Sequence, residues 1–245
     1  MRARTKARIF PVCAMCVCFP LLAQAQARRV SVPFVGCKSY GQSAVSDAPN
    51  GENLDVPIAA DAARQLAYYK TSRGVSVLAP RGWYCLAQSG SGGEELYVSP
   101  APEVFSANWR GFAGPAIEAE LISGENSGRY DIAKMIARVF PVRRALALSI
   151  IEGVELELPT GPYPSDRLTY KSSEIVEYDT PAQADGLGTE SRLLKNGMPI
   201  SGVVVLIGQQ PGLLHVLHLS ARLPAGLAAL TPVIIQQAER DAQRH

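Results

Sequence analysis

Short apolar runs separated by turn-forming residues recur along most of the sequence, and this rhythm restricts the folds it can adopt. Apolar runs of about four to eight residues bounded by Gly or Pro are typical of strands in an antiparallel sheet. The last two runs are joined by Gly208–Gly212, which predicts a hairpin. We expect strands over residues 75–79, 83–88, 96–99, 115–123, 168–171, 175–178, 202–207 and 213–220. The first three are separated by turn signals at 80–82 and 89–93, so we expect them to pair as a small antiparallel unit.

Helical spacing of apolar residues predicts helices over 58–71, 130–140 and 227–244. Pro141 should end the second helix, and the segment 141–153 fits either a further helix or a buried strand. The polar stretch 38–57 is typical of a loop. Because strands and helices come in blocks, we predict an α+β fold, a mainly antiparallel sheet with packed helices, in a single domain.

The first 27 residues have the three parts of a cleavable signal peptide. Four basic residues precede an apolar stretch over 9–22, which is too short to span a bilayer, since spanning takes about 20 residues. Small residues at 23, 25 and 27 suit a signal peptidase, with cleavage after Ala27. We therefore expect an exported domain over 28–245, in the periplasm or outside the cell, with no membrane anchor after cleavage.

Removal of that leader changes both the charge and the cysteine content. The whole chain has 24 basic and 22 acidic residues, so losing four basic residues leaves a net charge of −2. This balance gives no basic excess for nucleic acid, and we expect no nucleic-acid partner. Cys37 and Cys85 are the two cysteines left, and in an oxidising compartment we expect them to form a disulfide.

The sequence contains no clear catalytic or metal-binding motif. His215 and His218 are three residues apart, so on a strand they point to opposite faces and cannot share a metal. They are structural residues or, as an alternative, a ligand or general base. We expect no metal site and no cofactor, and the catalytic residues, if any, are unknown from the sequence.

Glycine clusters and acidic residues give weaker signals. SGSGG at 89–93 and GLGT at 186–189 lack the spacing of a phosphate loop or dinucleotide fingerprint, and both are typical of turns. Acidic residues offer several pairs for hydrolytic chemistry, although acids are also common on a solvated surface. These acids are Glu94 with Glu95, Glu174 with Glu177, and Asp179.

Five aromatic residues lie close to turns or in segments rich in Pro and Gly, where aromatic side chains often form contact surfaces. Packing in the core is the alternative for each of them. The candidate binding surface comprises Trp83, Tyr84, Tyr97, Trp109 and Tyr163.

Several stretches together resemble an uncharacterised family of secreted bacterial proteins. They include VLAPRGWYC at 77–85, LYVSP at 96–100, IARVFP at 136–141, GPYPSDRLTY at 161–170, IVEYDTPAQADGLGT at 175–189 and SGVVVLIG at 201–208. The resemblance implies a bacterial origin and one continuous domain, and it carries no activity, substrate or site residues.

These observations favour a non-enzymatic periplasmic or secreted protein that binds an envelope component or a protein partner. A secreted hydrolase of cell-wall or extracellular substrates is one alternative. The other is a secreted inhibitor or effector.

Overall fold

The computed structural model describes residues 29–42, 44–102, 110–208, 210 and 213–244. The expected signal peptide over 1–27 and its cleavage site at Ala27 lie outside the described residues.

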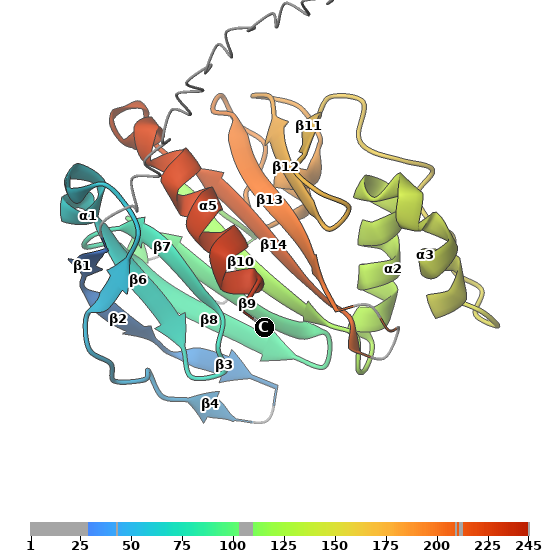
Figure 1. Ribbon diagram of the computed structural model, residues 1–245, viewed down its shortest axis with the longest axis horizontal. Coiled ribbons are helices and arrows are strands. Elements are labelled where there is room, and N and C mark those ends of the chain that lie inside the picture. The colour runs from blue at the N-terminus through green and yellow to red at the C-terminus, as the bar shows by residue number, and fades with distance from the viewer. Residues whose placement is uncertain (1–28, 43, 103–109, 209, 211–212, 245) are drawn as a thin grey trace, which may run out of the picture.

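A nine-stranded sheet, the large sheet, forms the centre of the molecule (Figure 1). Its spatial order is β11-β12-β13-β14-β10-β9-β8-β3-β4, and every neighbouring pair is antiparallel except β3 with β8. The predicted α+β class with a mainly antiparallel sheet is confirmed. The strands are β3 Ser39–Gly41, β4 Val45–Ser46, β8 Tyr84–Gly90, β9 Gly93–Ser99, β10 Ala116–Ser123, β11 Arg167–Tyr170, β12 Ile175–Thr180, β13 Ile200–Ile207 and β14 His215–Arg222.

Two smaller sheets and the helices pack around the large sheet. The three-stranded sheet, called the small sheet, has the order β2-β6-β7, and β1 pairs with β5 separately. These strands are β1 Val30–Val32, β2 Phe34–Cys37, β5 Leu54–Val56, β6 Leu66–Thr71 and β7 Ser76–Pro80. The helices are α1 Ala60–Gln65, α2 Gly128–Val139, α3 Arg144–Ile150, α4 Leu187–Glu190 and α5 Thr231–Ala242, with 3-10 turns η2 Pro141–Arg143 and η4 Ala225–Leu230.

The large sheet has a different core on each face. One face packs against the small sheet and α5, which crosses in front of the sheet in Figure 1, and we call it the α5 face. Leu96, Ile117 and Leu219 are fully buried there. The opposite face, the α2 face, packs Val204 and Val216 against α2 and α3. Successive residues of a strand point to opposite faces, so each strand contributes to both cores.

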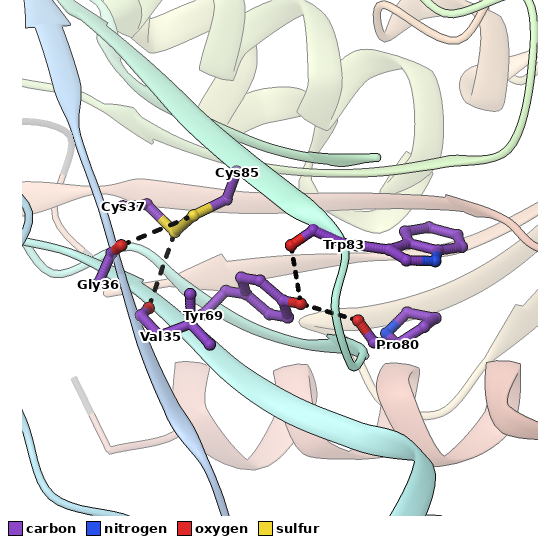
Figure 2. The surroundings of a disulfide bond; sticks show 7 residues. All are labelled: Val35, Gly36, Cys37, Tyr69, Pro80, Trp83 and Cys85. Carbon is purple, nitrogen blue, oxygen red and sulfur yellow. Dashed lines mark hydrogen bonds between the residues drawn. A yellow bond between two sulfur atoms is a disulfide. The ribbon is translucent and has the colours of Figure 1, made fainter. Parts of the chain in front are cut away.

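A disulfide between Cys37 and Cys85 joins β2 of the small sheet to β8 of the large sheet, as the sequence predicts. Figure 2 shows Tyr69 beside it, with the phenol oxygen 2.8 Å from the Pro80 carbonyl and 3.1 Å from the Trp83 carbonyl. Pro80 ends β7, and Trp83 directly precedes β8. The disulfide and the hydrogen bond from Tyr69 to Trp83 therefore both join the small sheet to the region of β8.

The predicted helix over 58–71 is correct only in its first half. α1 ends at Gln65, and Leu66–Thr71 forms β6 instead. β6 lies between β2 and β7, where Leu66, Ala67, Tyr68 and Tyr69 are all buried. A strand enclosed on both faces has no alternation, and its apolar residues therefore fitted a helical spacing equally well.

Three other expectations also need correction. The strands at 75–79 and 83–88 do not pair with each other, because β7 pairs with β6 while β8 pairs with β9. The stretch 38–57 contains the short strands β3, β4 and β5. The segment 186–189, expected to be a turn, includes most of the one-turn helix α4. The open choice over 141–153 is settled as helix, by η2 and α3.

Candidate functional site

Polar side chains gather on the α2 face of the large sheet, in two rows that cross three neighbouring strands. In the first row, Glu120 on β10 lies opposite both Glu95 on β9 and His218 on β14. In the second row, Glu118 lies opposite Tyr97 and Ser220. The residues between them along each strand, such as Ala119 and Leu219, belong to the apolar core of the α5 face. Strand alternation therefore concentrates the polar groups on one face.

Two adjoining hollows open over these rows, and we call them together the polar cleft. One has a volume of about 260 Å³ and lies by the β8–β9 turn, with Glu95 and Arg192 in its wall. The other, of about 280 Å³, is bounded by α2 residues and by Glu190 and His218. Glu120, Ile122 and Asp131 line both hollows. Glu120 therefore lies at the junction of the cleft.

Glu120 is the least satisfied charged group of the cleft. Burial raises its pKa to about 8, and the carboxylates of Glu95, Asp131 and Glu190 add to the shift, while Arg192 opposes it. Its side chain is 28% exposed, and its Oε2 atom lies 4.0 Å from His218 Nδ1, which is too long for a hydrogen bond. Within the described residues Glu120 makes no hydrogen bond. When Glu120 is ionised, it lies directly opposite the acid Glu95, and like charges in that arrangement destabilise a sheet.

His218 is held in place by a buried polar network. Its Nε2 atom lies 2.9 Å from the Tyr178 phenol oxygen, which is also 2.6 Å from Ser220 Oγ and 3.0 Å from the Leu219 carbonyl. Burial lowers the pKa of His218 to about 4, so its ring is neutral at pH 7. Only 3% of the residue is exposed, and that part lines the polar cleft.

Glu118 fixes the position of the Arg192 segment at the other side of the cleft. Its carboxylate accepts a hydrogen bond of 2.6 Å from the Arg192 backbone N–H. Burial raises the pKa of Glu118 well above its usual range. The same segment is held by the fully buried Arg222, which donates to the carbonyls of Phe112, Gly114 and Leu194. Both residues act on the shape of the cleft.

Three of the stretches quoted above, together with Glu190, form and support the far wall of the cleft. Tyr163 donates a 2.5 Å hydrogen bond to Glu190, and Arg138 lies 3.0 Å from the same carboxylate. The Arg138 guanidinium also lies 4.1 Å from the centre of the Tyr163 ring, a cation–π contact. Asp166 accepts the Leu187 N–H at 2.8 Å and so holds the start of α4.

Two glycines allow α4 to sit at this wall. A Cβ atom at Gly186 would lie 2.1 Å from Asp166 Oδ1, and one at Gly188 would lie 2.6 Å from Ile200. Neither position has room for a side chain. The GLGT stretch therefore serves close packing, which places Glu190 in the cleft.

The five predicted aromatic residues do not form one surface. Tyr97 is fully buried and donates a hydrogen bond to Glu95 of the cleft, and Tyr163 donates one to Glu190 of the cleft wall. Trp83 packs against the apolar core of the α5 face. Tyr84 is exposed on β8, outside the residues that line the cleft. Trp109 lies outside the described residues.

The predicted acid and histidine pairs are also separated. Glu94 points to the α5 face and accepts hydrogen bonds of 2.6 Å from Ser39 and Thr71, whereas Glu95 is in the cleft. His215 and His218 lie on opposite faces of β14, as the spacing predicts. The remaining acids form surface ion pairs, namely Glu174 with Arg143, Glu177 with Lys171 and Asp179 with Arg167.

A larger hollow of about 450 Å³ lies on the α5 face, between α5 and strands β12 and β13. Its charged residues are all paired, Lys171 with Glu177 at 3.2 Å and Asp179 with Arg167 at 2.6 Å. Its floor includes apolar residues such as Leu223 and Ile235. We prefer the polar cleft as the candidate site because its central carboxylate has no such partner.

Sequence reasoning missed Glu118, Glu120, Glu190 and Arg192. The first two were visible in the run AIEAELIS at 116–123, because strand alternation places both acids on one face between apolar neighbours. Glu190 and Arg192 come from a distant segment and reach the cleft only through the tertiary fold.

Within the described residues, no group of three or more His, Cys, Asp or Glu side chains is arranged to hold a metal ion. Nor does that part of the chain include a helix long and apolar enough to cross a membrane. No family model, curated protein or solved structure matches the chain.

Proposed function

We propose that the protein is an exported, non-enzymatic binding protein that holds a polar component of the cell envelope in its polar cleft. One observation carries this proposal. Glu120 lies at the junction of two hollows, and its side chain is 28% exposed and makes no hydrogen bond within the described residues. Ionisable groups that lower the stability of the fold are common at binding and catalytic sites, because the function of such a site requires them.

The proposed export rests on two further features. The first 27 residues have the composition of a signal peptide, and the Cys37–Cys85 disulfide suits an oxidising compartment such as the periplasm or the medium.

A thermal-shift screen of the oxidised protein tests the binding function. The panel contains peptidoglycan fragments, amino sugars, polyamines and lipid headgroups, each applied to the wild type and to the Glu120→Gln and Arg192→Met variants. A ligand at a hundred times its Kd adds about 2.7 kcal/mol, which raises Tm by roughly 5–10 °C for a domain of this size.

We expect such a shift for the wild type and for Glu174→Gln, a matched control in an ion pair outside the cleft. Both cleft variants should lose the shift. A ligand that stabilises the cleft variants as much as the wild type would place its site elsewhere and contradict the proposal.

A hydrolase is the second candidate, and one contact favours it. Glu95 and Glu120 are direct neighbours across β9 and β10, and a carboxyl group with a raised pKa can act as a general acid beside an ionised one. The test is hydrolysis of peptidoglycan and chromogenic glycosides. Activity lost in both Glu95→Gln and Glu120→Gln would replace the binding proposal with this one. The inhibitor or effector alternative has no contact of this kind in its favour.

A further inference from the structure

We propose that the polar cleft binds a primary ammonium group, seated between the Glu120 carboxylate and the His218 ring. This inference rests on the proposed function, since it assumes that the cleft is the ligand site. It adds the chemical class of the ligand, namely a small amine with a polar or apolar carrier.

The positions of the protons in the buried network leave one nitrogen of His218 as a hydrogen-bond acceptor. The Leu219 carbonyl can only accept, so the Tyr178 hydroxyl, 3.0 Å away, gives it its proton. The Tyr178 oxygen then accepts from His218, whose proton is on Nε2, 2.9 Å away. In the neutral ring this leaves His218 Nδ1 as an acceptor.

Two acceptors therefore face each other across the cleft floor. His218 Nδ1 and Glu120 Oε2 are 4.0 Å apart, and neither makes a hydrogen bond within the described part of the chain. Only 3% of the His218 residue is exposed, and it lines the cleft, so a ligand in the cleft can reach its ring. A single nitrogen donor about 2.8 Å from each atom would bridge the gap.

The charged side chains of α2 and α4 around this gap are paired with one another. On α2, Lys134 pairs with Asp131 at 3.2 Å, and Arg138 pairs with Glu190 of α4 at 3.0 Å. Each of these pairs is neutral overall. Glu120 is left without an ion pair at pH values where His218 is neutral.

The remaining groups that face Glu120 do not neutralise it. Glu95 on β9 and Glu118 on β10 are acids, and burial raises the pKa of Glu118 well above its usual range. Arg192 interacts with the charges of Glu95, Glu118 and Glu120. Once Glu120 ionises, near pH 8, its negative charge adds to this acidic cluster, and a bound ammonium would supply a balancing positive charge.

The shape of the gap favours an ammonium over a guanidinium. A guanidinium fork matches the two oxygens of one carboxylate, whereas these two acceptors belong to different side chains on adjacent strands. An ammonium is a compact group with three donors, so it can contact Glu120, His218 and one further acceptor such as Glu95.

The test follows the ¹⁵N chemical shift of His218 Nδ1 during titration with cadaverine, a primary diamine. Pentane-1,5-diol and glutarate are matched probes of the same length, one neutral and one anionic. We expect a saturable shift with cadaverine alone, an affinity at least tenfold lower in Glu120→Gln, and an unchanged affinity in Glu174→Gln.

A second measurement keeps the inference testable if Glu120→Gln fails to fold. Cadaverine keeps its charge between pH 6 and 8, since alkyl ammonium groups lose a proton near pH 10. Glu120 ionises over that range, so the wild-type affinity should rise at least tenfold.

Three results would overturn the inference. These are the absence of a saturable shift with cadaverine, an equal affinity in Glu120→Gln, and an affinity that does not change between pH 6 and 8. A saturable response to the diol or glutarate with none to cadaverine would overturn the ammonium inference but leave the proposed ligand site intact. Failure of the whole screen in the cleft would instead remove the proposed function.

Discussion

The two faces of the large sheet differ in what their strands contribute. On the α5 face, β9, β10 and β14 supply Leu96, Ile117 and Leu219, which are fully buried among apolar neighbours. On the α2 face the same strands supply Glu95, Glu120 and His218, one or three residues away along each strand. Apolar burial stabilises at about 25 cal/mol per Å², whereas an enclosed carboxyl group without a partner lowers stability. The α5 face therefore stabilises the fold, whereas the α2 face retains polar groups that lower its stability.

The largest test of the comparison truncates a side chain on the α5 face. Ile117→Ala should lower the free energy of unfolding by about 3 kcal/mol, because it leaves a cavity in a fully buried site. Urea denaturation measures this loss, and ligand binding in the cleft should persist at low denaturant. A loss below about 1 kcal/mol would show that this face is not the main source of stability.

The second test concerns the acid side of the pH profile. The folded-state pKa of His218 is about 4, below its value of 6.5 in the unfolded chain, so the folded state favours the neutral ring. Its contribution is present above pH 6.5 and is lost as the pH falls towards 4, by about 2 kcal/mol.

Acids with a raised pKa, such as Glu120, change the stability in the opposite direction over the same pH range. The contribution of His218 is therefore measured as a difference between two proteins. The wild type minus His218→Asn, measured by urea denaturation at pH 4 and pH 6.5, should show it. Parallel profiles of the two proteins would contradict the burial of a neutral His218.

The smallest expected effect is at the mouth of the cleft. Lys134 is half exposed and pairs with Asp131, so Lys134→Ala makes the cleft more negative by one charge. Its distance and exposure weaken the interaction, and we expect cadaverine affinity to rise about twofold at low salt. The gain should vanish at about 0.5 M salt. A lower affinity in this variant would mean that the lysine contacts the ligand.

Much of the fold could be predicted from the sequence because local signals agree with it. The hairpin of β13 and β14, the alternating strand β10 and the amphipathic helix α2 all appear where their spacing places them. The disulfide followed from counting cysteines after removal of the leader. β6 was missed because a strand buried on both faces has no period, and its parallel partner β2 is distant in sequence.

The candidate site was less visible for a related reason. Strand alternation gives Glu118 and Glu120 a common face, but nothing local shows that His218 and Glu95 flank Glu120. That neighbourhood depends on strand order, with β10 inserted between β9 and β14. Tyr97 and Tyr163 were chosen for their position near turns, and among the described aromatic residues of that set these two bind acids of the cleft, Glu95 and Glu190.

The most direct test of the contrast between the faces is the free energy of unfolding of Glu120→Gln relative to the wild type at pH 8. The folded-state pKa of Glu120, about 8, lies above its unfolded value of 4.5. Its stabilising contribution is therefore complete below pH 4.5 and is lost as the pH rises through 8. A neutral amide avoids this loss, so the variant should be more stable than the wild type at pH 8 by about 1–2 kcal/mol and should no longer bind amines. A variant less stable than the wild type at that pH would show that Glu120 supports the fold, and would contradict the account.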